Sequence, residues 1–343
     1  HVLLDQENGV IVVDHKLGIS SDVLKALFRY CISELNALGC SRKSTNSRDT
    51  GEWPLEHELT RALLLVKGDM PTLLAKRKCL VTEGLVDCET EIRLTKIVLT
   101  RHPKAPSIWF HRRFCQQILC SRLPNLGSQW KEAELEFIAR MCDVYPRNYY
   151  AWNHRLWLSL SLDFGALVSE LDNNVVWLKS HTTDHSAVSF RMQVIAEVLK
   201  RVQDESVPCS HPLLAPSAPL SAVPLPNGGL KAELSILYHE FEISDSVIAS
   251  RWGSGLGVET AWLHRRGVFC CLWKVISKFF FSGDGQDEKG RASIRMGGEN
   301  QITDKNKTGL DTLAELAWIL SSAFSASGER GGSLTEQAIR RSH

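Results

Sequence analysis

The sequence lacks an excess of charge of either sign. Its 343 residues include 40 Lys and Arg against 39 Asp and Glu, which gives a net charge of +1. A chain this close to neutral has no field that would hold a polyanion, which argues against nucleic-acid binding through bulk electrostatics. Apolar residues make up 43% of the chain, enough to fill a sizeable core. We therefore expect a folded protein with no nucleic-acid partner.

Long apolar runs are also missing. The most apolar stretch, Val268 to Phe281, is interrupted by Lys274 and Lys278, whereas a membrane span requires roughly 20 apolar residues in a row. The first residues do not have the basic-then-apolar layout of a signal peptide, and the sequence begins at His1 rather than at Met. We expect a soluble, cytoplasmic protein whose natural N-terminus lies before His1.

The cysteines lack the spacing of disulfide frameworks and metal sites. There are ten of them, with no Cys-x-x-Cys pair. Five lie in apolar, helix-like surroundings: Cys115, Cys120, Cys142, Cys270 and Cys271. Scattered cysteines in such surroundings are typical of reduced, buried thiols in a cytosolic protein. The sequence therefore predicts no disulfides.

The usual catalytic motifs are absent as well. The chain has no phosphate-binding loop, no Gly-x-Gly-x-x-Gly after a strand, no Gly-x-Ser-x-Gly elbow and no His-Glu-x-x-His. His181, Asp184 and His185 could offer metal donors, but no second cluster completes a site. The sequence predicts no metal in this chain and no enzyme that works by itself.

Proline is concentrated rather than spread. Six of the twelve prolines fall between Pro208 and Pro226, and so many prolines exclude a helix or a central strand. The polar, glycine-rich stretch from Ser282 to Thr308 has little to bury. We expect the following parts in chain order: an N-terminal segment with one helix (1–54), helical repeats (55–207), a linker (208–230), a further repeat (231–281), a flexible polar segment (282–308), and a last helix, Leu310 to Phe324, with a disordered tail (309–343).

Alternating, strand-like patterns are scarce, and only Val10 to Val13 offers a short extended candidate. Elsewhere apolar residues recur three and four apart, which is the period of a helix. One such face consists of Leu24, Leu27, Phe28, Cys31, Leu35 and Leu38, and another begins with Leu94, Ile97 and Val98. The sequence predicts an all-α fold.

The chain repeats itself. The pattern Trp-x-His-Arg begins at Trp109, Trp152 and Trp262, and degenerate copies end at Arg77 and Arg191. The first four arginines of this series are 35, 43 and 36 residues apart, within the range of known helical-hairpin repeats. We expect an α–α superhelix, a solenoid of helical hairpins like those of tetratricopeptide proteins.

The repeated side chains suit packing between hairpins. A Trp and an Arg three residues apart share one helix face and can form a cation–π contact, and a buried indole removes about 150 to 250 Å² from water. His and Arg can donate to acidic groups of a neighbouring repeat or subunit, and an Asn or Asp can cap the helix start. The residues to which we assign repeat packing or partner contact are Trp109, His111, Arg112, Asn148, Trp152, His154, Arg155, Asp184, Arg191, Trp262, His264 and Arg265.

The segments His102 to Arg113 and Tyr145 to Trp157 resemble the repeats of protein prenyltransferase α subunits, and the resemblance extends from about residue 60 to 281. The phrases Asp14 to Gly18, His181 to Ser186 and Glu259 to Arg266 are most similar to the repeat-containing proteins of this family.

This resemblance implies a crescent of paired helices that wraps a separate β subunit, with a β subunit of the Rab geranylgeranyltransferase type as the expected partner. The β subunit of such an enzyme holds zinc and the prenyl diphosphate, and a C-terminal cysteine of a protein substrate displaces diphosphate from a geranylgeranyl or farnesyl donor. Lys104 matches a family lysine that contacts the diphosphate, and Tyr149 matches a tyrosine near the mouth of the active site. Pro106 replaces a second family tyrosine, which removes a hydroxyl donor.

A second interpretation remains open from the sequence. Helical repeats of this kind also form non-catalytic scaffolds whose concave face binds peptides or proteins. Such a scaffold would be a stable monomer without a β subunit.

Overall fold

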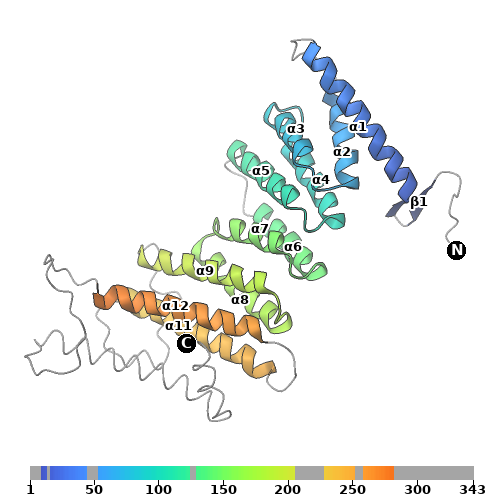
Figure 1. Ribbon diagram of the computed structural model, residues 1–343. Coiled ribbons are helices and arrows are strands. Elements are labelled where there is room, and N and C mark those ends of the chain that lie inside the picture. The colour runs from blue at the N-terminus through green and yellow to red at the C-terminus, as the bar shows by residue number, and fades with distance from the viewer. Residues whose placement is uncertain are drawn as a thin grey trace, which may run out of the picture. The chain divides into compact units, whose positions relative to one another are not determined.

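The computed structural model describes residues 9–13, 16–44, 53–123, 129–204, 228–251 and 258–281. In these ranges the chain is helical except for one antiparallel hairpin of β1 (Val10–Val13) and β2 (Lys16–Ile19), in which Val10 is paired with Ile19. The helices are α1 (Ser21–Ser44), α2 (Trp53–Val66), α3 (Pro71–Thr82), α4 (Cys88–Arg101), α5 (Pro106–Arg122), α6 (Gln129–Val144), α7 (Tyr149–Ser159), α8 (Phe164–Ser180), α9 (His185–Gln203), α11 (Gly228–Arg251) and α12 (Glu259–Phe281) (Figure 1).

The helices pack as consecutive antiparallel pairs, which confirms the predicted all-α fold of helical hairpins. The pairs α2–α3, α4–α5, α8–α9 and α11–α12 are each in direct contact (Figure 1). The chain divides into two compact units, residues 1–158 and residues 159–343. In both units one helix face is apolar and buried, because its residues recur with the helical period.

The predicted face of α1 is the one that turns inward: Cys31 and Leu35 are buried, while the other four residues of this face are less so. The predicted strand is β1, and its partner β2 was not anticipated. In α4 the prediction is wrong at one residue, since Ile97 is 57% exposed while Leu94 and Val98 are buried. The buried face of α4 continues through Leu99 instead.

The turns that precede α3, α5 and α7 are joined to one another. The hydroxyl of Tyr145 donates to the carbonyl oxygen of Thr100 over 2.6 Å, and the ring of His102 reaches the carbonyl oxygen of Leu65. At Gly68 a Cβ atom would lie only 2.8 Å from the His102 side chain, so this position between α2 and α3 must be glycine for the approach. These contacts hold the turns along one edge of the first unit.

Parts of the predicted domain organisation lie outside the described residues. These are most of the proline-rich linker, the stretch from Ser282 to Thr308, the helix from Leu310 to Phe324 and the tail. The described chain resumes with α11 at Gly228, inside the range predicted for the linker. No helix among the described residues is both long and apolar enough to cross a membrane.

The cysteines whose side chains the structure describes form no disulfide with one another, but they are not all buried as the sequence suggested. Cys115 and Cys142 lie in the core, Cys120 and Cys271 are half-buried, and Cys270 is exposed on α12.

Candidate functional site

The degenerate first repeat contains a buried ionic network. Arg77 of α3 is fully buried and makes a bidentate ion pair with Glu91 of α4 through Nε and Nη2. The same carboxylate lies 2.9 Å from Nε2 of His111 on α5. The third guanidinium nitrogen, Nη1, donates to the carbonyl oxygen of His57 over 3.0 Å and to Oγ1 of Thr60 over 2.7 Å. One arginine thus joins two consecutive hairpins.

The next repeat reproduces this network. Arg112 of α5 makes a bidentate pair with Glu134 of α6, with Nε 2.7 Å from Oε1. Nε2 of His154 on α7 lies 2.9 Å from the same oxygen. Nη1 donates to the carbonyl oxygen of Ile92 and to Oγ1 of Thr95, over 2.7 and 2.9 Å. The Arg and His of successive Trp-x-His-Arg motifs therefore meet on one glutamate.

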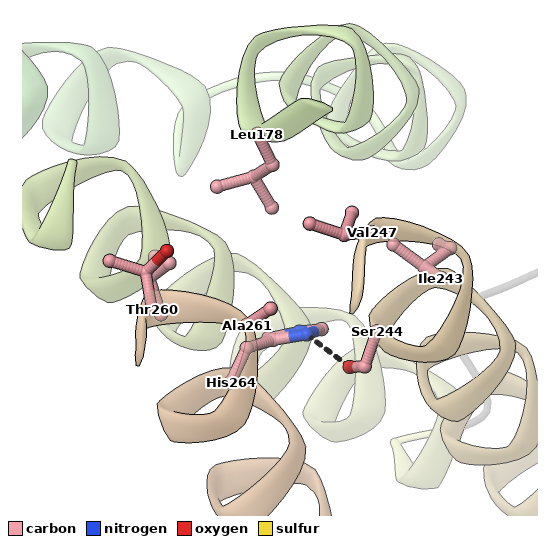
Figure 2. A pocket seen from close by; sticks show the side chains of 8 residues that line it. Leu178, Ile243, Ser244, Val247, Thr260, Ala261 and His264 are labelled. Atoms are coloured by element: carbon pink, nitrogen blue, oxygen red, sulfur yellow. Dashed lines mark hydrogen bonds between the residues drawn. The ribbon is translucent and has the colours of Figure 1, made fainter. Parts of the chain in front are cut away.

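A third network lies in the second unit. Arg191 of α9 makes two bonds of 2.7 and 2.8 Å with Glu240 of α11, and its Nη1 donates to the carbonyl oxygen of Leu171 over 2.6 Å. Nε2 of His264 on α12 lies 3.1 Å from Glu240. Nδ1 of His264 lies 2.8 Å from Oγ of Ser244, a contact that Figure 2 draws as a dashed line. The glutamate is 49 residues from its arginine, so the pair closes across the proline-rich segment.

These three networks share one geometry. In each, the Arg reaches a main-chain carbonyl 20 residues earlier in its own hairpin and the glutamate of the next hairpin. Charged groups are expensive to bury unless they are paired and hydrogen-bonded, and here each carboxylate faces both a guanidinium and an imidazole. The His and Arg of the motif consequently hold consecutive hairpins together inside the chain.

The networks change the acidity of their members. Burial alone would raise the pKa of Glu134, but hydrogen bonds from Arg112 and His154 outweigh this effect and lower the pKa to about 2. The pKa of Glu240 is also lowered, because the charge of Arg191 and the bond from His264 overcome the effect of burial. Burial lowers the pKa of His154 despite its bond to Glu134. At neutral pH the glutamates are therefore ionised.

We expect the stability of the fold to fall in acid through Glu134. A carboxyl whose pKa is depressed in the folded state stabilises the fold above its unfolded pKa of about 4.5, and this contribution is lost as the pH falls towards 2. The difference in unfolding free energy between the natural chain and Glu134→Gln should therefore shrink over this window, as measured by urea unfolding at several pH values. A difference that does not vary with pH would contradict the assignment.

The indole of Trp109 is buried at the junction of two hairpins. It is 3% exposed, and its Nε1 donates to the carbonyl oxygen of Pro103 over 2.9 Å. Its ring centroid lies 6.1 Å from Phe137 of α6 and 5.2 Å from His154 of α7. This Trp therefore packs one repeat against the next.

Asn148 and Asp184 each lie at the start of a helix. Asn148 precedes α7, accepts from the amide of Ala151 over 3.2 Å, and donates to the carbonyl oxygen of Pro103 over 2.8 Å. Asp184 precedes α9 and accepts from the amides of Ser186 and Ala187. Both side chains are buried. Asn148 thus starts a helix and also ties the turn before α7 to the turn before α5.

The remaining motif residues differ in exposure. Trp152 and Arg155 of α7 are 5% and 8% exposed, and the guanidinium carbon lies 5.9 Å from the indole, in the expected cation–π arrangement. Arg265 of α12 is buried and pairs through Nη1 with Asp245 of its own hairpin. Trp262, however, is 45% exposed. The Trp that opens the last motif does not have the burial expected of a packing residue.

Lys104 and Tyr149 both lie towards the surface. Lys104 is in the turn before α5, and Tyr149 is the first residue of α7 and is 56% exposed. Arg147, also exposed, stands next to Asn148 with a left-handed φ of 57°. The bond from Asn148 to Pro103 brings these two turns together. The result is an edge with a cation on each turn, which we call the basic edge (Lys104, Arg147 and Tyr149).

One group of side chains has the composition of a metal site. Glu91, His111 and Cys115 are the described residues that come close enough together to hold a metal ion. Cys115, four residues after His111, occupies the position that Leu158 and Val268 occupy after His154 and His264, and burial raises its thiol pKa strongly. Because Glu91 is already paired with Arg77, this cysteine acts as a core residue.

A small cavity in the second unit is lined mainly by apolar residues of α8, α9, α11 and α12 (Figure 2). Its free volume of about 10 Å³ is at the lower limit for one water molecule. Two of its polar groups, Ser244 and His264, already bond each other. The cavity is a packing gap beside the ionic network rather than a binding pocket.

Comparison with known proteins fits this architecture. The model of the "protein prenyltransferase alpha subunit repeat" matches residues 88–119 and 131–162, which contain most of α4 to α7. "Protein prenyltransferase alpha subunit repeat-containing protein 1" of Danio rerio is 27% identical over 317 residues, covering 87% of this chain and 72% of the relative. The human protein of the same name is 30% identical over 285 residues, covering 76% of this chain and 68% of the relative.

The chain belongs to this family of repeat-containing proteins. A shorter similarity links this family member to the "geranylgeranyl transferase type-2 subunit alpha" of Saccharomyces cerevisiae, at 33% identity over 67 residues and 20% of each chain.

The sequence reasoning missed the acidic members of the networks in this repeat protein, Glu91, Glu134 and Glu240. Acidic residues on predicted helices are usually solvated, so nothing in their type marks them. A signal was nevertheless present, because Glu91 precedes His111 by 20 residues and Glu134 precedes His154 by the same number. This repeated spacing of 20 residues between a glutamate and the His of the motif would have predicted that the two side chains meet.

Proposed function

We propose that this repeat protein acts as the α subunit of a heterodimeric protein prenyltransferase. It would assist transfer of a geranylgeranyl or farnesyl group to a C-terminal cysteine of protein substrates. Family membership supports the architecture, and the observation that carries the proposal is the basic edge. There Lys104 and Arg147 stand on adjacent turns with Tyr149 beside them, and none of the three is buried by the described chain.

In the proposed reaction the basic edge only stabilises the diphosphate that leaves. The substrate thiolate attacks the first carbon of the prenyl chain, the carbon–oxygen bond breaks, and diphosphate leaves with the negative charge. Cations at helix N-termini stabilise such an anion. Lys104 and Arg147 would provide them, with Tyr149 as a hydroxyl donor. Zinc would be held by the β subunit and would keep the substrate thiol ionised.

One feature limits where the anion can lie. Ser107, in the first turn of α5, donates to the carboxylate of Asp69, so an acid already occupies this side of the α5 N-terminus. We therefore place the diphosphate on the side of Lys104 that faces Arg147. The partner that we propose is a β subunit of the Rab geranylgeranyltransferase type, and the compartment is the cytoplasm.

The decisive experiment is co-expression with that β subunit. The two chains should co-purify as a stable complex, and the complex should transfer a prenyl group from its diphosphate to a protein with a C-terminal cysteine. Parallel assays with geranylgeranyl and farnesyl donors identify the lipid. Absence of both a complex and transfer would exclude the proposed role.

Replacing Lys104 should affect turnover but not assembly. We expect Lys104→Ala to lower the transfer rate of the complex about 10-fold or more, since one cation at a developing charge contributes at least about 1.4 kcal/mol. Lys200→Ala is a matched control, because Lys200 is equally a surface lysine but lies at the end of α9. Equal rates for the two variants would remove Lys104 from the site.

A second function is favoured by one observation. Pro106 is the first residue of α5, where active family subunits carry a tyrosine, so this chain lacks one hydroxyl donor near the basic edge. A non-catalytic scaffold that binds peptides or proteins needs no such donor. It predicts a stable monomer that captures an extended peptide and that shows no transfer with any prenyltransferase β subunit.

A further inference from the structure

The outer face of α12 is more apolar than a surface should be. Trp262, Phe269 and Trp273 recur along this helix with the helical period and are 45%, 46% and 61% exposed. We call these three residues the α12 terminal face. Large exposed aromatic patches mark contact surfaces. We therefore expect another helix or chain to pack on this face.

The corresponding face of α9 shows what covers it in an earlier repeat. Counted from the buried arginine of each motif, Trp262, Phe269 and Trp273 correspond to Val188, Ile195 and Leu199. Those three are 7%, 0% and 7% exposed, because α11 and α12 pack on α9 (Figure 1). The α12 terminal face is therefore the place where the next helix of the solenoid would lie.

Three covering helices, α4, α6 and α11, share a recognisable pattern. In each of them a glutamate pairs with the arginine of the preceding motif, and the residue three positions later is a large apolar one. Phe137 follows Glu134 in this way and packs on Trp109. Ile243 follows Glu240 and lines the same small cavity as Val188. A helix that covers α12 should have a glutamate and, three residues later, a large apolar side chain.

The chain after α12 contains this pattern at Glu315 and Trp318, inside the segment from Leu310 to Phe324. We propose that this segment is the covering helix of a terminal half-repeat. In this half-repeat Glu315 shares Arg265 with Asp245, its partner in the described chain, and Trp318 packs on Trp262. The pattern continues with Ile319, whereas Ser322 and Ala323 are smaller than the residues seven and eight positions after Glu134, Met141 and Cys142. This smaller size leaves room for the bulky Phe269 and Trp273.

Charge and chain length agree with this occupant. The terminal face is flanked by the exposed cations Arg266 and Lys274, whereas the segment contributes the acids Asp311 and Glu315 and no basic residue. The 28 residues between Phe281 and Leu310 can span on the order of 90 Å when extended. That is well beyond the roughly 35 Å length of a 23-residue helix such as α12.

A pair of neighbouring thiols can test the proposal in the full chain. Position 269 corresponds to fully buried Ile195, whereas Cys270 corresponds to exposed Ala196. In a Phe269→Cys chain we expect the introduced thiol to be alkylated at least 10-fold more slowly than Cys270. Adding Trp318→Ala should raise the rate at position 269 at least 10-fold, because it removes a side chain that holds the covering helix in place, and should leave Cys270 unchanged. Ser327→Ala, outside the segment, is the matched control.

A photo-crosslinking amino acid at position 318 identifies the occupant directly. Within one chain it should react with residues of α12. Equal alkylation of positions 269 and 270, or a crosslink to any other helix, would overturn the proposal. A crosslink between two chains, together with a dimer at the same concentration, would assign the α12 terminal face to a second copy and would also overturn it. Should Trp318→Ala unfold the chain, Glu315→Gln tests the same docking with a smaller change.

Discussion

Glu134→Leu is expected to destabilise the first unit by about 3 to 5 kcal/mol. The glutamate is 4% exposed and holds Arg112 by two bonds and His154 by a third. Its removal leaves a guanidinium buried at 2% exposure without the carboxylate that balances its charge, and breaking one half of a buried pair typically costs this much. Urea unfolding followed by circular dichroism measures the loss.

The same helix supplies a matched control. Glu136 of α6 pairs with Arg140 over 3.4 Å, but both side chains are more than 70% exposed. We expect Glu136→Leu to change the unfolding free energy by less than about 1 kcal/mol, since water screens exposed pairs of this kind. If Glu134→Leu and Glu136→Leu lower the unfolding free energy equally, burial does not determine how much the ion pair of Glu134 contributes to stability.

The double variant Arg112→Met with Glu134→Leu separates the cost of leaving Arg112 unpaired from the cost of losing the bonds that the network makes. Removing both charges leaves no unpaired ion, and a buried pair can often be replaced by apolar residues of similar size at little cost. The double variant should therefore be more stable than Glu134→Leu by itself. A loss that simply adds the two single losses would show that Arg112 contributes mainly through its bonds to Ile92 and Thr95.

The repeat was predictable because each hairpin of a solenoid needs the same residues at the same spacing. The positions of Trp109, Trp152 and the arginines indicated helical hairpins, and the degenerate copies at Arg77 and Arg191 prove to be full members, since both arginines are buried and paired. Departures within one helix, such as exposed Ile97, depend on neighbouring helices that no local pattern records.

The roles of His111 and Arg112 were less predictable. The sequence showed donors that could serve a neighbouring repeat or a partner subunit, and only tertiary structure shows which acids they meet. Arg191 and Glu240 are 49 residues apart in the sequence. The length of the linker sets this separation, so the spacing of the repeat does not predict it. Lys104 and Tyr149 lie towards the surface, where burial within one chain says nothing of a partner.

Trp109→Ala is expected to cost about 3 to 5 kcal/mol, because it removes a buried aromatic side chain and leaves a cavity. The indole is 3% exposed, contacts rings of two helices in the next hairpin, and donates to the carbonyl of Pro103. That carbonyl also accepts from Asn148. The substitution should therefore loosen the contact between hairpins and the turns of the basic edge together.

Phe110→Ala is the control for Trp109→Ala, since Phe110 is the next residue of α5 and is 57% exposed. It removes a side chain of similar type from an exposed side of the helix and should cost less than about 1 kcal/mol. Hydrogen exchange distinguishes a general loss of stability from a local one. Faster exchange in α6 and α7 than in α1 would show that the indole joins consecutive hairpins, whereas equal acceleration in all helices would mean that the unit unfolds as a whole and that Trp109 has no special role at the junction.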